Sequence, residues 1–209
     1  MHLDLAFLAS AFVTLFVTID PVGSAPLFPA LTQGMSRHER RGVALRASLI
    51  GAGLLAFFAL SGEAALEFVG ISMPAFRIAG GLLLFLIAVD MLFEKRSERR
   101  AHTAGEEPPG DDPSVFPLAI PFLAGPGSIT SIILLAGRTE GPAELAALIA
   151  VMLAVIAVAF VLFLASGLIE AMLGRTGVVV VTRILGMFVA ALAVEFVLTG
   201  LRNVGALAG

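Results

Sequence analysis

The feature that most constrains this chain is a series of long apolar runs that contain almost no charged side chains. Residues 146–168 carry no charge, and residues 43–60 carry only Arg46. A stretch of about 20 apolar residues matches the thickness of the hydrocarbon core of a bilayer. A soluble helical core would need polar stripes at helical spacing, which these runs lack. The chain is therefore predicted to be an integral membrane protein.

Six such segments predict an all-α membrane protein with six transmembrane helices. Their approximate ranges are 5–32, 43–62, 73–93, 115–137, 145–168 and 178–201. The stretch 94–114 between the third and fourth segments is charged, contains Pro and Gly, and has no large apolar side chain. Such a stretch cannot bury enough surface to order itself, so we expect a flexible cytoplasmic loop there. This loop would divide the chain into a first half, 1–93, and a second half, 115–209.

Lys and Arg gather in alternate connections, which predicts the orientation of the chain. One side is rich in basic residues and should be cytoplasmic: Arg37, Arg40, Arg41, Arg46, Lys95, Arg96, Arg99, Arg100, Arg175 and Arg183. The other side has Arg77, Arg138 and Arg202. With an even number of helices, both termini are expected on the outer face of a bacterial inner membrane. The N-terminus has no basic n-region, so we expect the first helix to be retained rather than cleaved as a signal peptide.

The two halves resemble each other at an offset of about half the chain. Asp20-Pro21-Val22-Gly23-Ser24 matches Gly125-Pro126-Gly127-Ser128, and the run 76–80 (FRIAG) matches 182–186 (TRILG). Further along, 88–90 (AVD) matches 193–195 (AVE) with one residue of slippage. Because each half holds three spans, the second copy must be inverted in the membrane. The expected fold is therefore two inverted three-helix repeats, an arrangement typical of secondary transporters but also found in channels.

Both first segments of the repeats contain a helix-breaking motif near the middle. Pro removes a backbone donor, and Gly allows backbone geometry that other residues avoid. Breaks in hydrocarbon survive only against protein or a watery cavity. We therefore expect the first and fourth helices to be broken near the midplane and to share a cavity. The candidate substrate-binding residues are Asp20, Pro21, Gly23, Ser24, Gly125, Pro126, Gly127 and Ser128.

Each break should also begin a new half-helix, whose N-terminus attracts anions. Asp20 suits the N-cap position before Pro21. A substrate carboxylate could bind at the two N-termini while ionised Asp20 accepts an ammonium group, which would suit a zwitterion. The alternative is that Asp20 only caps its half-helix and that Pro126 and Gly127 only permit close packing.

Other polar residues within the segments are candidates for coupling or gating. Glu195 lies among apolar residues in the sixth segment, where an ionisable side chain is costly and marks either function or structural pairing. Arg77 and Arg183 occupy equivalent positions in the two halves, although Arg side chains at helix ends also snorkel to the interface. Asp90 lies near the cytoplasmic end of its segment, where solvation explains it.

The composition excludes several functional classes. The chain has no Cys, and His2, His38 and His102 all lie outside the apolar segments. Thiol chemistry is therefore excluded, and a buried His metal site or a serine hydrolase with a His base is not expected. The net charge of -3 and the lack of a basic patch outside the loops argue against nucleic acid binding. We expect no enzymatic activity and no cofactor, and the sequence leaves the oligomeric state open.

Three motifs resemble the MarC family of integral membrane proteins. They are DPVGSAPLF at 20–28, GIS at 70–72 followed by AFRIAGG at 75–81, and PLAIPFLAGPG at 117–127. The resemblance covers nearly the whole chain except 94–114, and it implies a transporter similar to those of neutral amino acids. Two positions depart from the family pattern: Ser24 where Asn is expected, and Glu195 where a neutral amide is expected.

The sequence thus predicts a secondary transporter of small neutral amino acids, in the exporting direction if it follows the wider group it resembles. Its partners would be the lipid bilayer and a small-molecule substrate, with proton or sodium coupling. Two alternatives stay open. One is a cation or metal transporter that uses Asp20, Asp90 and Glu195 as oxygen ligands, and the other is a membrane scaffold without transport.

Overall fold

Helices make up all the regular secondary structure in the residues that the computed structural model describes, which are 4–93, 95, 99 and 112–206. Among these described residues, five helical stretches are long and apolar enough to cross a membrane, and a sixth span results if the bent pair 114–123 and 126–136 counts as one. The predicted loop 94–114 lies mostly outside the described residues. The prediction of a multi-pass helical membrane protein is thus confirmed.

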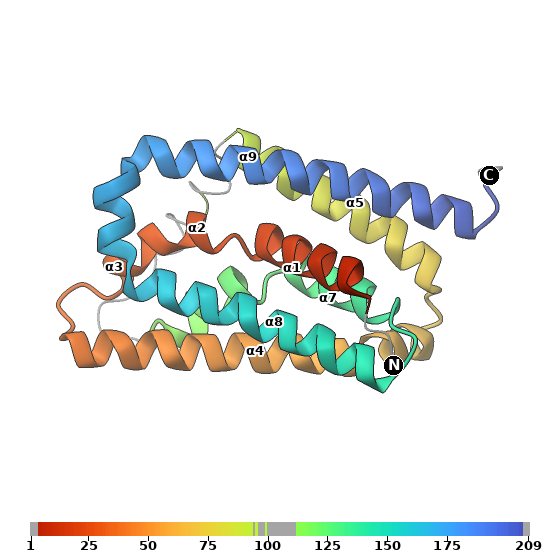
Figure 1. Cartoon of the computed structure of the whole chain (residues 1–209), viewed down its shortest axis with the longest axis horizontal. Coiled ribbons are helices and arrows are strands. Elements are labelled where there is room, and N and C mark those ends of the chain that lie inside the picture. The colour runs from red at the N-terminus through yellow and green to blue at the C-terminus, as the bar shows by residue number, and fades with distance from the viewer. Residues whose placement is uncertain (1–3, 94, 96–98, 100–111, 207–209) are drawn as a thin grey trace.

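The first half contributes three stretches that run back and forth along the long axis of the molecule (Figure 1). The first comprises α1 (Leu5–Ile19), α2 (Pro21–Ser24), the 3₁₀ turn η1 (Ala25–Leu27) and α3 (Phe28–Leu31). The second is α4 (Arg37–Phe68) and the third is α5 (Met73–Leu92). Helix α4 extends beyond the predicted 43–62 at both ends, and a capping box formed by Ser36 and Glu39 begins it at Arg37.

The second half begins with an irregular stretch, η2 (Ser114–Leu123), followed by α7 (Pro126–Ala136), α8 (Pro142–Leu164) and α9 (Ser166–Asn203). Phe116 and Ile120 have extended backbone dihedrals, and η2 and α7 meet at an angle of 55°. The sequence interpretation missed this irregularity. Its cause lies in Pro117 and Pro121, which remove two backbone donors within five residues. Helix α9 also bends at Gly174, where φ is 60°.

The stretch from η2 to α7 runs beside α4, from Arg46 to Gly62, in the same direction. Arg46 of α4 pairs with Asp112 at 2.8 Å, just before η2. Farther along α4, Gly51 packs against Leu123 and Gly62 against Ile133. Residue numbers therefore increase in the same direction along α4 and along the stretch from η2 to α7. The stretch 114–136 therefore crosses the molecule instead of turning back as a hairpin.

The Arg46–Asp112 pair fixes the start of this crossing. Partial burial opposes ionisation of Asp112, but hydrogen bonds from the hydroxyl and N–H of Ser114 and the charge of Arg46 outweigh it. The pKa of Asp112 is therefore lowered from its ordinary value. The Ser114 N–H donates to Asp112 Oδ1 at 3.0 Å.

Helices α5 and α9 form the most extensive helix pairing, and they run antiparallel. Their contact depends on glycines that let the two backbones approach closely. A Cβ at Gly81 would lie 2.7 Å from the carbonyl oxygen of Ala193, and a Cβ at Gly186 would lie 3.4 Å from that of Ala88. A Cβ at Gly200 would lie 2.6 Å from Ile78 Cγ1 and 3.0 Å from the Pro74 carbonyl oxygen.

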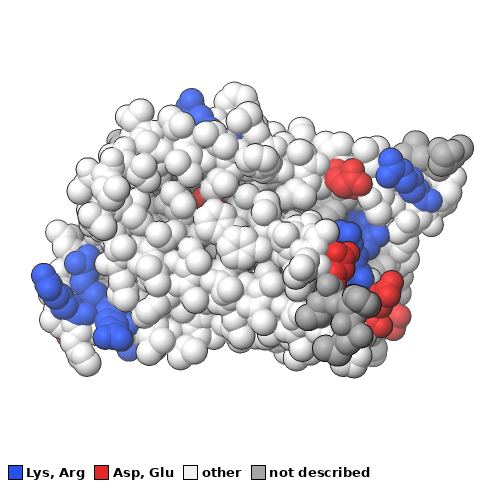
Figure 2. Space-filling model, viewed as in Figure 1, with Lys and Arg blue, Asp and Glu red and all other residues white. Residues whose placement is uncertain are grey.

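Both termini lie at one end of the molecule, at the right in Figure 1. Helix α4 begins at the opposite end with Arg37, Arg40 and Arg41. In the view of Figure 2, Lys and Arg predominate at that end, whereas the end that carries the termini shows Asp and Glu together with Lys and Arg. On this face, the charges of the described residues are therefore distributed unequally between the two ends.

Candidate functional site

The first helix ends at Asp20, which adopts a left-handed conformation with φ 55° and ψ 63°. Its side chain is buried, and Oδ1 accepts a hydrogen bond from the Gly23 N–H at 3.0 Å, which caps α2. Pro21 occupies the first turn of α2, where no donor is required. The Ser24 hydroxyl donates back to the Asp20 carbonyl at 3.0 Å. The predicted capping role of Asp20 is confirmed.

The second interruption lies between η2 and α7. Pro126 occupies the first turn of α7, as predicted, and a Cβ at Gly125 would collide with the Pro121 carbonyl. The Ser128 hydroxyl accepts from the Gly125 N–H at 3.0 Å and can donate to the Leu123 carbonyl at 2.8 Å. It thereby satisfies the polar backbone atoms that the interruption exposes.

A cavity of about 240 Å³ lies at the start of α7, and four of the predicted site residues line it: Gly125, Pro126, Gly127 and Ser128. Arg99 also lines the cavity. The other lining residues come from α1, α5 and η2: Thr18, Leu83, Ile87, Asp90, Pro121 and Phe122. Asp90 forms an ion pair with Arg99 at 2.7 Å. The cavity therefore combines a helix N-terminus, two hydroxyl groups and a carboxylate.

The predicted residues of the first break do not line this cavity. Asp20, Pro21, Gly23 and Ser24 lie just beyond Thr18, and α2 packs against α8 and α9. The sequence interpretation missed Thr18 and assigned Asp90 to the interface. The match of Asp90 with Glu195 between the halves was the signal that could have drawn attention to Asp90.

Glu195 lines a different hollow, a groove of about 310 Å³ between α1 and α9. Its side chain is 62% exposed, accepts from the Thr199 hydroxyl at 3.2 Å and lies 4.0 Å from Arg202. Among the residues described, no group of three acidic or His side chains could hold a metal ion. Asp20, Asp90 and Glu195 thus do not converge, and the alternative of a metal transporter built on them loses its basis.

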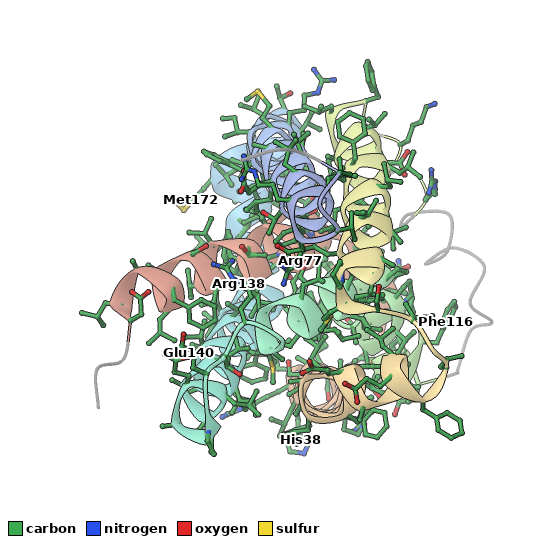
Figure 3. The ribbon with its side chains drawn as sticks, turned by 90° about the vertical axis from the view of Figure 1, so that its right-hand side faces the viewer. His38, Arg77, Phe116, Arg138, Glu140 and Met172 are labelled. Carbon is green, nitrogen blue, oxygen red and sulfur yellow. The ribbon has the colours of Figure 1, made fainter. Side chains whose placement is uncertain are left out.

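Arg77 and Arg183 lie at opposite ends of the antiparallel α5–α9 pair. Arg77 is half-buried one turn into α5, and with the Asn203 amide oriented toward it, its Nη1 donates to the amide oxygen at 2.9 Å. Figure 3 looks onto this end and shows Arg77 and Arg138 near its centre. Arg183 is exposed in α9. Neither arginine lines the cavity at α7.

Asp20 offers a test that separates its capping role from its charge. Replacing Asp20 by Ala should destabilise the protein by about 0.5–2 kcal/mol through loss of the cap, with a further cost for Ala in the left-handed region. Asp20→Asn should cost less, because Asn caps well and tolerates φ above zero. Thermal unfolding in detergent, followed by far-UV circular dichroism, measures both. Equal stabilities of the two variants would contradict this account of Asp20.

Comparison with known proteins agrees with this architecture. Residues 5–204 match the family described as MarC family integral membrane protein. The chain is 37% identical over 195 residues to a UPF0056 membrane protein of Aquifex aeolicus, covering 92% of this chain and 91% of the relative. It is 34% identical to UPF0056 membrane protein YvbG of Bacillus subtilis, with 95% of each chain covered. It is 32% identical to UPF0056 inner membrane protein YhgN of Escherichia coli, covering 92% of this chain and 95% of that protein.

No solved structure matches the chain. The family match spans all the crossing stretches described above, including both interruptions, and the relatives are covered over nearly their whole length. The chain therefore belongs to the MarC family of integral membrane proteins.

Proposed function

We propose that this protein is a secondary transporter of small neutral amino acids and that the substrate binds in the cavity at the start of α7. The observation that carries the proposal is the pairing, in one cavity, of a helix N-terminus with a carboxylate. These two groups are complementary to the two ends of a zwitterion. The proposal involves transport without covalent chemistry and without a cofactor.

The substrate carboxylate would bind at the N-terminus of α7. The first N–H groups of a helix have no carbonyl partner one turn earlier, and the aligned peptide dipoles favour a negative charge there. Pro126 starts the helix, so the next amides, those of Gly127 and Ser128, are the available donors. Gly127 also keeps this wall open, since a Cβ there would lie 2.9 Å from Ile87 Cδ1.

The substrate ammonium would bind Asp90, which lies on the α5 wall of the same cavity. In the present structure Arg99 neutralises Asp90 at 2.7 Å. A substrate ammonium would take the place of the Arg99 guanidinium, so the carboxylate would have a cationic partner before and after binding. Thr18 brings the end of α1 to the cavity, which links Asp20, Pro21, Gly23 and Ser24 to the same region.

The size and lining of the cavity favour small substrates without a charged side chain. Its volume of about 240 Å³ is below the range of about 300–1,000 Å³ typical of drug-sized ligand sites. Leu83, Ile87 and Phe122 supply an apolar wall, with Asp90 and Arg99 as its charged groups. Glycine, alanine and serine fit these limits best.

The packing supports the inverted repeat of the two halves. At the offset of 105 residues that relates 88–90 to 193–195, the contact of Gly81 with the Ala193 carbonyl becomes the contact of Gly186 with the Ala88 carbonyl, whereas the runs 76–80 and 182–186 are related by 106. The equivalent spans also contact one another in pairs: α1 with α7, α4 with α8, and α5 with α9. Arg77 and Arg183, which match in sequence, lie at opposite ends of the α5–α9 pair, as inversion requires.

The charge distribution supports a location in the inner membrane with both termini outside. The basic start of α4 would face the cytoplasm. In that orientation the cavity at Asp90 lies toward the cytoplasmic side and Glu195 toward the outer half of the membrane. Proton or sodium coupling, with Glu195, Arg77 and Arg183 as the groups to test, completes the proposal.

Transport by reconstituted protein tests the proposal directly. Proteoliposomes should accumulate radiolabelled glycine, alanine or serine when a proton or sodium gradient is imposed, and an ionophore that dissipates the gradient should abolish accumulation. Counterflow, in which unlabelled substrate inside drives uptake of labelled substrate, measures carrier-mediated exchange without an imposed ion gradient. If none of the three amino acids moves under either gradient or in counterflow, the proposed substrate class is wrong.

A further inference from the structure

We infer that the groove at Glu195 is a second ammonium-binding site, the counterpart of the Asp90 site for access from the opposite side of the membrane. The groove has a volume of about 310 Å³ and lies between α1 and α9. It is lined by Ser10, Val13, Thr14, Phe188, Ala191, Leu192 and Glu195. None of these residues lines the cavity at α7.

One wall of each hollow follows the repeat, whereas the start of α7, which completes the cavity, corresponds to 20–23, and these residues do not line the groove. Adding 105 to Leu83, Ile87 and Asp90, the α5 wall of the cavity, gives Phe188, Leu192 and Glu195, the α9 wall of the groove. The two triplets lie on antiparallel helices. The acidic residues therefore face opposite ends of the molecule, each at the end of an apolar wall of the same spacing.

Each acid has an Arg near it on its C-terminal side, although Asp90 is 16% exposed and Glu195 is 62% exposed. Arg99 follows Asp90 by nine residues and contacts it at 2.7 Å, while Arg202 follows Glu195 by seven and lies at 4.0 Å. Each hollow includes a threonine of α1, Thr18 in the cavity and Thr14 in the groove. The longer Arg202 distance leaves the Glu195 carboxylate more open to a competing cation than Asp90 is.

The chemistry of the groove selects an amine. One carboxylate, the α1 hydroxyls of Ser10 and Thr14 and an otherwise apolar lining suit a single ammonium group on a small body. A divalent cation would need several oxygen ligands, and the described residues supply no group of three carboxylates. We commit to the ammonium of the soluble substrate as the occupant, and this identity rests on the proposed function.

Labelling of Glu195 by dicyclohexylcarbodiimide tests the site without any need for transport. This reagent modifies carboxyl groups that are accessible from the membrane, and mass spectrometry locates the adduct. The probe is methylammonium chloride, added to proteoliposomes of phosphatidylcholine and phosphatidylglycerol. At several times its Kd, methylammonium should reduce labelling of Glu195 by about fivefold, while choline chloride at equal ionic strength should not.

Two internal references sharpen this measurement. Glu170, an exposed residue of α9 that lies outside the groove, should be labelled equally with and without methylammonium. Thr14→Val should weaken the protection of Glu195. Equal protection by methylammonium and choline, or loss of protection only when phosphatidylethanolamine is included in the vesicles, would overturn the inference of a site for a small soluble amine.

Transport kinetics measured from each side provide the second readout. Glu195→Gln should raise the KM for substrate added to the outer face by about tenfold, the equivalent of about 1.4 kcal/mol, and leave the KM at the inner face unchanged. Equal changes at both faces would overturn the assignment of the groove to the outer side. If the wild type moves no amino acid, the proposed function fails, whereas the labelling result still decides whether the groove binds an amine.

Discussion

Asp90→Asn should reduce amino acid transport by at least about 30-fold in kcat/KM, because it removes the partner of the substrate ammonium. Truncating one member of a buried, hydrogen-bonded charge pair costs about 2–5 kcal/mol, and the lower figure corresponds to this factor. Asn preserves the size of the side chain, so the cavity keeps its shape. Initial rates of glycine or alanine uptake in proteoliposomes, taken over a range of substrate concentrations, give the ratio.

Two matched variants separate the role of Asp90 from a general effect of charge. Asp112 also forms an ion pair with an Arg, at 2.8 Å, but it lies outside the cavity, so Asp112→Asn should transport normally. Asp20→Asn should keep most of the activity, because it retains the cap on α2. If Asp20→Asn is inactive and Asp90→Asn is fully active, the partner of the substrate ammonium is Asp20 and not Asp90.

Gly81→Leu should destabilise the fold more than any other single change discussed above, by about 3 kcal/mol or more. The new side chain would meet the Ala193 carbonyl oxygen and the backbone N of Val197. Backbone atoms of a neighbouring helix cannot move aside as a flexible side chain can, so α5 and α9 would have to separate. Unfolding by sodium dodecyl sulfate in mixed micelles, followed by circular dichroism, measures the loss.

Gly53→Leu is the control for this substitution. Gly53 lies in α4, is exposed, and has no heavy atom within 4 Å of the position where a Cβ would stand. The same change of residue type should therefore leave the unfolding midpoint nearly unchanged. Similar midpoints for the two variants would show that the α5–α9 contact is not as tight as the structure indicates.

The sequence was sufficient to predict the features that depend on local chemistry. Apolar length located the crossing stretches, because the bilayer sets a minimum span. Asp20 before Pro21 predicted the cap, and Pro126 predicted the start of α7, because both depend on residues within one turn. The start of α4 was placed too late because the polar first turn, which begins at Arg37, does not belong to the apolar run.

The features that depend on contacts between distant segments could not be predicted in the same way. Pro117 and Pro121 are incompatible with a regular helix, but the path that η2 follows instead depends on its packing against α4. The meeting of Thr18, Asp90 and Gly127 in one cavity joins residues from three separate stretches. A single sequence contains no signal for such a meeting except the repeat itself, which paired Asp90 with Glu195.

The glycine contacts between α5 and α9 also limit how the molecule can change shape. The two helices pack so closely that a Cβ at Gly81 would lie 2.7 Å from the Ala193 carbonyl oxygen and a Cβ at Gly186 would lie 2.9 Å from Met91 Cβ, so we expect them to move as one rigid body. If the binding site opens alternately to the two sides of the membrane, α1, α4, α7 and α8 must then move relative to the α5–α9 pair. Asp90 lies on α5 and Glu195 lies on α9, so the distance between them would stay constant while the helices opposite them move.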